Sequence, residues 1–298
     1  MSARVSIITP SFNQGKYIER TIQSVLAQGV PQLEYLVMDG GSTDDTVKIL
    51  QRYSHRFHWV SEKDKGHADA INKGVMRSTG SIIGWLNSDD IYYPGALAST
   101  LAFFDTHPEV DVVYGDANHT DEHDRVIERY PTESWNWERL LETCFISQPA
   151  TFFRRTVFDR FGPIDPTAAP SIDYEYWIRL GRRGAKFVHL PRLLAATRLH
   201  DEAFTIRSRI ACHAAINNFM RRHCGKTPER WIFNYAHAVV ETKGIKRDEP
   251  LLFATAVSLV SLYASLRWNH GISRNILQTT RGWVGGTASR VLREKFAL

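Results

Sequence analysis

Cysteine is scarce in this chain of 298 residues, and its placement argues against a disulfide-stabilised protein. Cys144, Cys212 and Cys224 form no CxxC pair, and their odd number leaves one unpaired. That usage fits a reducing cytoplasm. The sequence also has no signal peptide after Met1, no internal repeat and no low-complexity tract. With 43% hydrophobic and 23% charged residues, the composition is that of an ordinary globular protein.

Most of the chain has no excess of positive or negative charge. Residues 241–298 hold nine basic and four acidic side chains, an excess of five that equals the formal net charge of the whole protein. Residues 1–240 are therefore neutral overall. A neutral body argues against nucleic-acid binding, and a basic tail points to a local partner.

The first half of the chain alternates strand and helix patterns. Strands are expected at residues 5–8, 33–38, 57–60 and 81–86, and helices at residues 18–26, from residue 42 onward and at residues 68–77. Ser42 and Asp45 stand at the spacing of a capping box. The alternation predicts an α/β fold, with a mostly parallel sheet flanked by helices as in Rossmann-like nucleotide-binding domains.

Two common phosphate-binding motifs are absent from this α/β half. The GxGxxG fingerprint of dinucleotide-binding proteins does not follow the first strand, where residues 10–15 read PSFNQG, and there is no P-loop. The dinucleotide-binding alternative is thereby disfavoured. A nucleotide fold that handles a diphosphate through a metal ion remains.

Each predicted strand ends in a polar, turn-forming cluster, at residues 9–13, 39–42, 62–66 and 87–90. Ligands of open α/β sheets bind at the carboxyl ends of the strands, so the four clusters predict one composite site. Glycine lets the backbone approach a ligand, and helix N-termini favour anions. Asp39 is expected to accept a hydrogen bond from a base imide or a ribose hydroxyl, or alternatively to cap the next helix.

An acidic island at Asn87, Ser88, Asp89 and Asp90 follows the apolar run 82–86. Carboxylates at the mouth of a buried strand need a partner, and a hard metal ion carrying phosphates is the partner that best explains them. A plain turn before a helix at Pro94 is the alternative, because Asn, Ser and Asp are all turn formers.

Four sequence blocks carry a family resemblance. They are TPSFN at residues 9–13, DGGSTD at 39–44, DAINKG at 69–74 and WLNSDD at 85–90. Their order and spacing resemble those of family 2 glycosyltransferases over residues 4–205. The resemblance implies a GT-A fold and an inverting transfer from a nucleotide-sugar donor, most often a UDP-sugar.

The same resemblance assigns residues to the donor site. Those that match the nucleoside pocket and the segment beside the donor are Thr9, Pro10, Asn13, Asp39, Asp69 and Asn72. Asn87, Ser88 and Asp89 take the place of the DxD motif, so Asp89 is expected to bind Mn²⁺ or Mg²⁺ that bridges the diphosphate. Asn87 replaces the first Asp of that motif, which removes a charge but keeps an acceptor.

Two further residues are expected beside the diphosphate. Arg198 is expected to pair with it, because guanidinium matches phosphate oxygens well. His200 lies where many relatives place a histidine that completes the metal or diphosphate site. A structural role for His200 is the alternative.

The second half contains the expected general base. Asp173 precedes a helix that carries Trp177, as in the family's acidic pair, although Ile172 stands where the family has Glu. Inverting transfer needs one carboxylate to take the proton of the acceptor hydroxyl. Helix capping is the alternative for Asp173. Gln148 and Trp177 are expected near the acceptor, with a structural hydrogen bond and core packing as their alternatives.

Beyond residue 205 the resemblance fades and a helical extension is predicted, with helices at residues 206–222 and 228–240. Residues 250–266 follow without a charge, between basic residues at 243, 246, 247, 267 and 274. This stretch is short of the ~20 apolar residues of a spanning helix, and it suits attachment to an anionic cytoplasmic leaflet. A hairpin packed on the catalytic domain, or on a second subunit of a homo-oligomer, is the alternative.

The expected organisation is a catalytic domain over residues 1–205, with its nucleotide-sugar part at 1–115 and its acceptor part at 116–205, followed by an extension over 206–298. The sequence predicts an inverting, metal-dependent glycosyltransferase in bacterial polysaccharide or cell-envelope biosynthesis. Its acceptor would be a hydroxyl of a glycan or a lipid-linked molecule at the inner face of the plasma membrane. A nucleotidyltransferase that makes the nucleotide-sugar and a non-catalytic scaffold that binds it are the alternatives.

Overall fold

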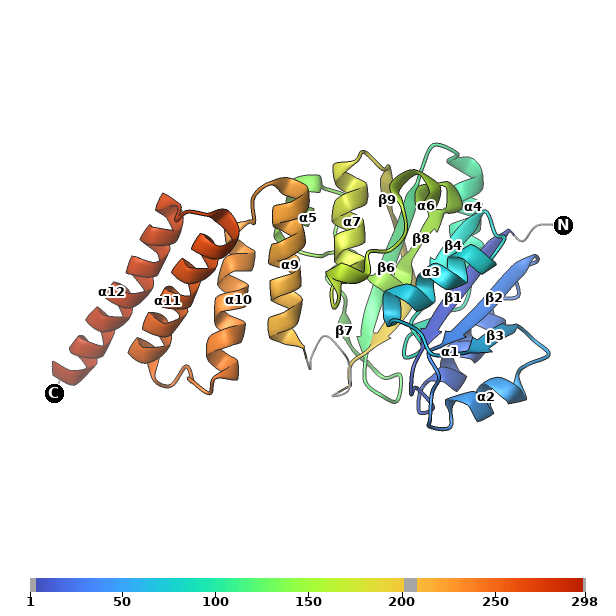
Figure 1. Cartoon of the computed structure of the whole chain (residues 1–298), viewed down its shortest axis with the longest axis horizontal. Coiled ribbons are helices and arrows are strands. Elements are labelled where there is room, and N and C mark those ends of the chain that lie inside the picture. The colour runs from blue at the N-terminus through green and yellow to red at the C-terminus, as the bar shows by residue number, and fades with distance from the viewer. Residues whose placement is uncertain (1–3, 201–207, 297–298) are drawn as a thin grey trace. The chain divides into compact units, whose positions relative to one another are not determined.

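The computed structural model describes residues 4–200 and 208–296 (Figure 1). The chain divides into two compact units, Met1–Thr167 with Tyr176–Ala203, and Ala168–Glu175 with Phe204–Leu298. The domain boundary expected at residue 205 lies outside the described residues. The segment Ala168–Glu175 belongs to the second unit, although the sequence assigned it to the catalytic domain.

The described part of the first unit holds a sheet of nine strands. The strands are β1 (Val5–Ser11), β2 (Leu33–Asp39), β3 (His58–Ser61), β4 (Ile82–Trp85), β5 (Ile91–Tyr92), β6 (Val112–Thr120), β7 (Val126–Arg129), β8 (Thr151–Arg154) and β9 (Phe187–Arg198). The helices are α1 (Ile18–Leu26), α2 (Thr46–Arg52), α3 (His67–Arg77), α4 (Ala96–Thr106), α5 (Trp137–Glu142) and α6 (Arg155–Phe161). Two 3-10 turns are η1 (Gln148–Ala150) and η2 (Pro166–Ala168). Helix α7 (Ile172–Arg182) begins in the second unit and ends in the first.

The strand order in the sheet is β3-β2-β1-β4-β8-β6-β9-β5, with β7 paired to β6. Strands β3, β2, β1 and β4 are parallel, whereas β8 runs antiparallel to both β4 and β6. The predicted parallel sheet is therefore confirmed for the first four strands, and the rest of the sheet is mixed. The order reverses between β1 and β4, and ligands of such sheets bind outside the carboxyl ends of the strands at that switch point.

Side chains alternate across β1, and helices cover both faces of the sheet. Ile7 packs with Ile18 and Ile22 of α1 in the main hydrophobic core. Ile8 points to the other face, where Gly74 of α3 approaches so closely that an added Cβ would lie 2.4 Å from Ile8 Cγ2. The prediction of helices on both faces is thus confirmed, and glycine at position 74 permits the close approach of α3.

Helix α2 does not begin with the predicted capping box. It begins at Thr46, and its N-cap Asp45 makes no side-chain capping bond. Ser42 binds Asp39 instead, through both its amide and its hydroxyl. Asp39 thereby takes both donors of Ser42. The capping box predicted at Ser42 and Asp45 is therefore wrong, and Asp44 Oδ1 accepts the Thr46 N–H at 3.0 Å in its place.

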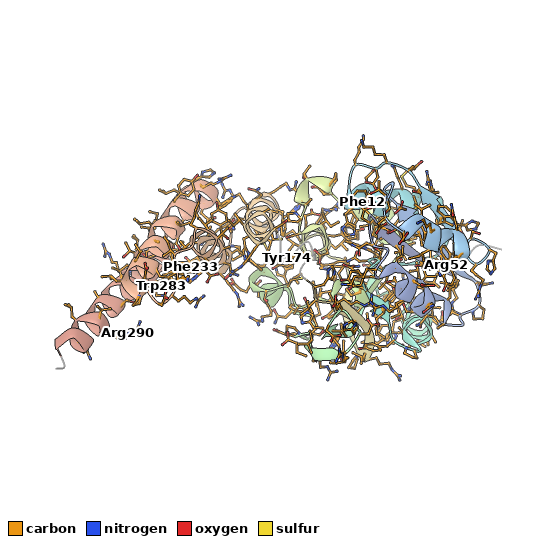
Figure 2. All side chains as sticks on the ribbon, turned by 90° about the horizontal axis from the view of Figure 1, so that it is seen from below. Phe12, Arg52, Tyr174, Phe233, Trp283 and Arg290 are labelled. Carbon is orange, nitrogen blue, oxygen red and sulfur yellow. The ribbon has the colours of Figure 1, made fainter. Side chains whose placement is uncertain are left out.

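The second unit contains four helices among its described residues. They are α9 (Arg209–Cys224), α10 (Glu229–Thr242), α11 (Pro250–Asn269) and α12 (Arg274–Phe296). The sequence predicted the first three, although the start expected at residue 206 lies outside the described residues. It did not predict α12, whose glycines at 282, 285 and 286 weaken the helical signal. Phe233 of α10 and Trp283 of α12 pack edge to face with ring centroids 4.9 Å apart (Figure 2).

Candidate functional site

Asp39 is the last residue of β2 and is buried at the carboxyl edge of the parallel strands. Its Oδ2 accepts hydrogen bonds from Gly41 N (3.1 Å), Ser42 N (2.9 Å) and Ser61 Oγ (2.6 Å). Its Oδ1 accepts from Ser42 Oγ. The amides fix the carboxylate, whereas the two hydroxyls can rotate away. A ribose or base donor would therefore reach Asp39 by displacing a serine hydroxyl.

Asn13 joins the loop after β1 to the loop after β2. Its Oδ1 accepts a hydrogen bond from Thr43 N (2.8 Å), and its own N–H donates to Ser42 Oγ (2.7 Å). The backbone of Asn13 has a φ of 54°, in the left-handed region that Asn tolerates better than most residues. Asn13 thus links the two loops at the carboxyl edge of the parallel strands.

Asn87 organises the turn that stands in place of the DxD motif. Its Oδ1 accepts a hydrogen bond from Trp85 Nε1 (2.8 Å) and lies 3.0 Å from His67 Nε2. Its Nδ2 donates to Asp90 Oδ2 at 3.4 Å. An aspartate at position 87 would bring a third negative charge beside Asp89 and Asp90. The amide therefore supports the turn without adding to that repulsion.

The turn is anchored by Thr21 of α1 and by Asp90. Thr21 Oγ lies 2.9 Å from the carbonyl oxygen of Ser88 and 2.7 Å from that of Asp90, and shares its hydrogen between them. Asp90 is buried, and its Oδ1 accepts a hydrogen bond from Arg198 N (3.2 Å). Burial, with the charge of Asp89 adding, raises the pKa of Asp90 well above its usual range. Asp90 is thus an internal anchor, and a metal-binding role for Asp89 stays a prediction.

Asp89 and His200 form a partly buried pair. The side chain of Asp89 is 23% exposed, and its Oδ2 lies 3.1 Å from His200 Nε2. The His200 ring packs on Tyr17 with centroids 4.6 Å apart. The Asp89 carboxylate fits the expected Mn²⁺ or Mg²⁺, both of which prefer oxygen ligands, whereas the imidazole of His200 is a poor ligand for Mg²⁺.

The pair would need further ligands to hold a metal ion. Within residues 4–200 and 208–296, no group of three or more His, Cys, Asp and Glu side chains is placed to bind one. Oxygen atoms from a donor diphosphate or from water would have to fill the remaining positions, as is usual for Mg²⁺ bound with substrate phosphates.

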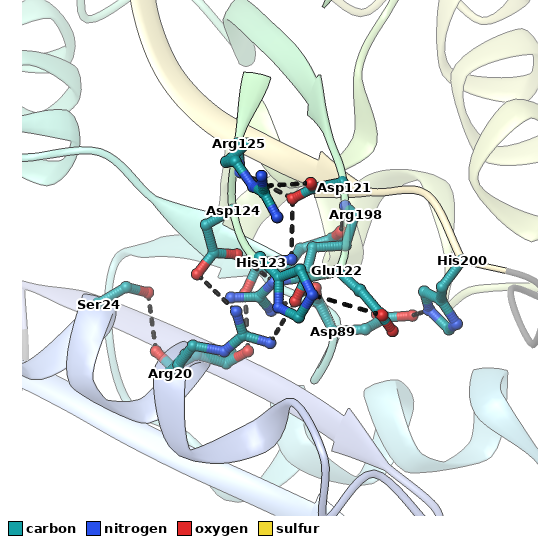
Figure 3. A network of polar contacts seen from close by, with 12 residues as sticks. Arg20, Ser24, Asp89, Asp121, Glu122, His123, Asp124, Arg125, Arg198 and His200 are labelled. Atoms are coloured by element: carbon teal, nitrogen blue, oxygen red, sulfur yellow. Dashed lines mark hydrogen bonds and ion pairs between the residues drawn. The ribbon is translucent and has the colours of Figure 1, made fainter. Parts of the chain in front are cut away.

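Arg198 ends β9 with its side chain fully enclosed (Figure 3). Its Nη1 donates to the Asp89 carbonyl oxygen (2.6 Å), and its Nε donates to the Asp124 carboxylate. Arg20 of α1 pairs with the same carboxylate at 2.9 Å. A contact between Arg198 and a diphosphate stays a prediction, and the buried Nη2 of Arg198 has no hydrogen-bond partner among the described residues. The geometry makes Arg198 a positioning residue for Asp89.

Asp69 and Asn72 lie on α3 with different partners. Asp69 Oδ2 accepts a hydrogen bond from Lys65 N (3.0 Å) and pairs with Lys73 (2.9 Å), and these contacts lower the pKa of Asp69. Asn72 binds both the carbonyl oxygen and the N–H of Ile164, each at 2.9 Å. Asn72 thus ties α3 to the loop after α6, and donor contacts of both residues stay predictions.

The expected site residues Thr9, Pro10, Gln148 and Trp177 are buried too. Thr9 Oγ1 accepts a hydrogen bond from the Tyr35 hydroxyl (3.2 Å), so its side chain faces the core. Gln148 Nε2 donates to the Trp85 carbonyl oxygen (2.5 Å), which joins η1 to β4. These positions agree with the structural alternatives for Gln148 and Trp177, and ligand contacts of the four stay predictions.

Asp173 lies in the first turn of α7 and belongs to the second unit. Burial raises the pKa of its carboxyl group, and a hydrogen bond from the Tyr174 amide partly offsets that shift. Because α7 begins at Ile172, Asp173 is inside the helix rather than at its N-cap. A carboxylate with a raised pKa is better suited to accept a proton than an ordinary surface carboxylate.

The sequence did not predict three contributors to this site. They are Thr21, His67 and Asp124, which support Ser88, Asn87 and Arg198 respectively. His67 had a local signal, because it follows Gly66 in the third polar cluster. Thr21 and Asp124 had none, because their partners lie 67 and 74 residues away in the sequence.

Named relatives match more than half of this chain. Chondroitin synthase of Escherichia coli is 30% identical over 210 residues, which cover 68% of this chain and 30% of that protein. A PGL/p-HBAD biosynthesis glycosyltransferase of Mycobacterium bovis is 32% identical over 183 residues, covering 58% of this chain and 68% of that protein. The chain thus spans less than a third of the length of the chondroitin synthase.

Solved structures of glycosyltransferases share the fold. TarS 1-349 of S. aureus in complex with UDP-GlcNAc superposes with a TM-score of 0.61 and 16% identity, covering 95% of this chain and 89% of that one. Mannosyltransferase PcManGT from Pyrobaculum calidifontis, in complex with GDP-Man and Mn²⁺, gives a TM-score of 0.61 at 18% identity, covering 100% of this chain and 88% of that one. At these identities the similarity establishes the GT-A fold.

A family model described as Glycosyl transferase family 2 matches residues 6–162, more than half of the chain. The matched range runs from β1 to the end of α6 and contains both Asp39 and Asp89. The chain belongs to glycosyl transferase family 2, and it is a glycosyltransferase that uses a nucleotide-sugar donor.

Proposed function

We propose that this glycosyltransferase is inverting and metal-dependent. The observation that carries the proposal is the pair formed by Asp89 and His200, 3.1 Å apart at the carboxyl edge of the parallel strands. Asp39 lies at the same edge as a buried acceptor for the nucleoside. Anchoring by Thr21 and Arg198 holds the Asp89 turn before any donor binds, and such preorganisation lowers the cost of binding a charged ligand.

The proposed reaction needs one proton acceptor and one group that stabilises the leaving diphosphate. The acceptor oxygen forms a bond to the anomeric carbon while the bond from that carbon to the diphosphate oxygen breaks. Asp173 takes the hydroxyl proton, a role suited to a carboxylate whose pKa is raised by burial. Mn²⁺ or Mg²⁺ held by Asp89 and His200 would stabilise the negative charge on the diphosphate. Inversion follows because the displacement is direct.

We infer that the donor is a UDP-sugar. The related structures carry UDP-GlcNAc in TarS and GDP-Man with Mn²⁺ in PcManGT, so the fold accommodates either base. The acceptor we propose is a hydroxyl of a glycan or a lipid-linked molecule in bacterial polysaccharide or cell-envelope biosynthesis. The names of the relatives, chondroitin synthase and a PGL/p-HBAD biosynthesis enzyme, favour that class. We also propose that the enzyme acts at the inner face of the plasma membrane.

Calorimetry of UDP, GDP and dTDP, each with and without Mn²⁺, tests the donor site. We expect one nucleotide to bind tightly only with Mn²⁺, and Asp89→Asn to abolish the metal-dependent part. Asp45→Asn is the matched control, because Asp45 is an exposed carboxylate that pairs with Lys48 outside the Asp89 turn. The metal site would be contradicted if every nucleotide bound equally well with and without Mn²⁺, and equally well to the unmodified chain and to Asp89→Asn.

Product analysis separates this proposal from its alternatives. A glycosyltransferase releases a nucleoside diphosphate from the donor when an acceptor is supplied. Release of pyrophosphate would indicate a nucleotidyltransferase instead. Tight nucleotide binding with no turnover, unaffected by Asp173→Asn, would indicate a sugar-nucleotide-binding scaffold.

A further inference from the structure

Helix α11 turns its large apolar side chains to solvent. The four most regularly spaced are Leu252, Leu259, Tyr263 and Leu266, with 52%, 63%, 57% and 53% of their surface exposed. Their spacing of seven, four and three residues places them along one face of the helix. We name these four residues the apolar stripe. Scattered single leucines are common on protein surfaces, but a continuous stripe of four large side chains is not.

The opposite face of α11 is buried, and it mixes the large side chains of Phe253, Val257 and Trp268 with small and polar ones. Ala254, Ser258, Ser261 and Ser265 all lie inside the second unit, at helical spacing. Ser258 and Ser261 donate to the carbonyl oxygens of residues four positions earlier, each at 2.7 Å, and Ser265 donates to the Gly271 carbonyl oxygen at 2.6 Å. The buried hydroxyls are therefore satisfied and carry no desolvation penalty.

The large apolar side chains that face outward and the three serines that face inward depart from what water favours. A surface helix of a protein that meets only water buries leucine and exposes serine. Helices that meet lipid do the opposite, with small residues and hydroxyls at helix contacts and large apolar residues outward. The serines that make the sequence of α11 look too polar for a membrane do not face outward at all.

Contacts within the second unit favour a position of α11 in the plane of the membrane interface over one that crosses the bilayer. Within the described part of the chain, α11 is the one helix long and apolar enough to cross a bilayer, yet 44% of its apolar window is buried by protein. It packs against both α10 and α12. Helix α10 carries charged Glu229 and Glu241 at its ends, each bound to polar partners. A bundle with those carboxylates suits the interface better than the hydrocarbon centre.

Basic side chains accompany the apolar stripe. Arg267 is exposed directly after Leu266, and Arg274 and Arg281 are exposed on α12 with Leu277 between them at helical spacing. Symmetric pairing of two copies through this surface would bring like charges together. Anionic headgroups would instead complement the arginines while acyl chains cover the leucines.

We propose that the apolar stripe and these three arginines form a docking surface for an anionic lipid bilayer, on which α11 lies in the plane of the interface. The second unit then holds the enzyme at the membrane through one helix face. This surface is independent of the donor site, so its failure would leave the proposed reaction unaffected.

Vesicle sedimentation of the full chain, without donor or acceptor, tests the proposal. Vesicles of pure phosphatidylcholine are compared with equimolar phosphatidylcholine and phosphatidylglycerol. We expect binding to the anionic vesicles that weakens as ionic strength rises. The variant L252Q/L259Q/L266Q should lower the partition coefficient at least ~10-fold, because three leucines no longer enter the interface. The variant R267Q/R274Q/R281Q should lower it ~100-fold on anionic vesicles alone.

Met76→Gln is the matched control, because Met76 is an 80% exposed apolar residue on α3 of the first unit. It should sediment like the unmodified chain, and thermal melting should confirm that all variants fold. Failure of the unmodified chain to bind either kind of vesicle would overturn the proposal. So would a dimer in analytical ultracentrifugation that the leucine variant dissociates, because the stripe would then be a contact between copies.

Discussion

Arg198 Nη1 donates a 2.6 Å hydrogen bond to the backbone carbonyl oxygen of Asp89, from a side chain that is fully enclosed. The Nε of the same guanidinium binds the carboxylate of Asp124 in the turn between β6 and β7. Arg198 therefore connects the β6–β7 turn to the carboxylate expected to bind metal. A guanidinium is suited to this task because its donors are fixed in one plane.

Arg198→Met should loosen the Asp89 turn. It leaves a buried carbonyl oxygen without a donor and removes one partner of Asp124, so the free energy of unfolding should fall by about 3 kcal/mol. Affinity for Mn²⁺ in the presence of UDP should fall about 10–100-fold, as for other residues that orient metal ligands. Chemical denaturation and Mn²⁺ titration followed by electron paramagnetic resonance measure the two effects.

Arg20→Gln is the control for Arg198. Arg20 also pairs with Asp124 but makes no bond to Asp89. Its loss should cost at most about 1 kcal/mol, because the pair is partly exposed, and should leave Mn²⁺ affinity unchanged. Equal losses of Mn²⁺ affinity in both variants would contradict a direct role of Arg198 at Asp89.

His200→Asn should remove one of the two protein groups of the proposed metal site. Mn²⁺ affinity should fall by more than about 100-fold, because a direct ligand contributes more than an orienting residue. UDP without metal should bind as before, since His200 packs on Tyr17 and not on Asp39. His58→Asn, at an exposed position of β3, is the matched control. Unchanged metal affinity in His200→Asn would remove His200 from the site.

Asp173 should set the acidic limb of the pH–rate profile. A general base works only when ionised, so turnover should fall as pH drops through the pKa of Asp173. Burial raises that pKa, which places the fall above the pH range of an ordinary aspartate. Asp173→Asn should lower kcat about 10²–10⁴-fold while UDP binding stays intact. Two results together would exclude Asp173 as the base. Asp173→Glu would have the same acidic limb as the unmodified enzyme, and Asp173→Asn would remain active.

His213 should make the stability of the second unit pH-dependent. Burial, with Arg209 adding, lowers its pKa from 6.5 to about 4. The unfolded chain therefore binds a proton before the folded chain does, so stability is complete above pH 6.5 and declines as pH falls toward 4. The free energy of unfolding should fall by at most about 3 kcal/mol. Denaturation at several pH values measures it.

His213→Gln should flatten that pH dependence, because glutamine has no proton to gain. His270→Asn is the control, since His270 is exposed and asparagine tolerates its φ of 55°. The control should retain the full pH dependence of the unmodified chain. A slope that persists in His213→Gln would assign the effect to another group.

Much of the fold was predictable because its signals are local. The face formed by Ile18, Ile22 and Val25 predicted α1, which the structure confirms. The polar clusters after the strands were visible for the same reason, because each directly follows an apolar run. The capping box at Ser42 and Asp45 was wrong because Asp39, three residues before Ser42, accepts both the amide and the hydroxyl of Ser42, and α2 begins only at Thr46.

The sequence by itself determined the order of strands and helices up to β4, the carboxylates at the strand ends and the basic charge of the tail. Only the tertiary structure decided which of these groups meet. Asp89 and His200 are 111 residues apart, and Arg198 and Asp124 are 74 apart, so their pairing depends on the position of β9 beside β6. The outward leucines and inward serines of α11 were likewise decided by packing, because helical spacing defines two opposite faces but not which one the neighbouring helices cover.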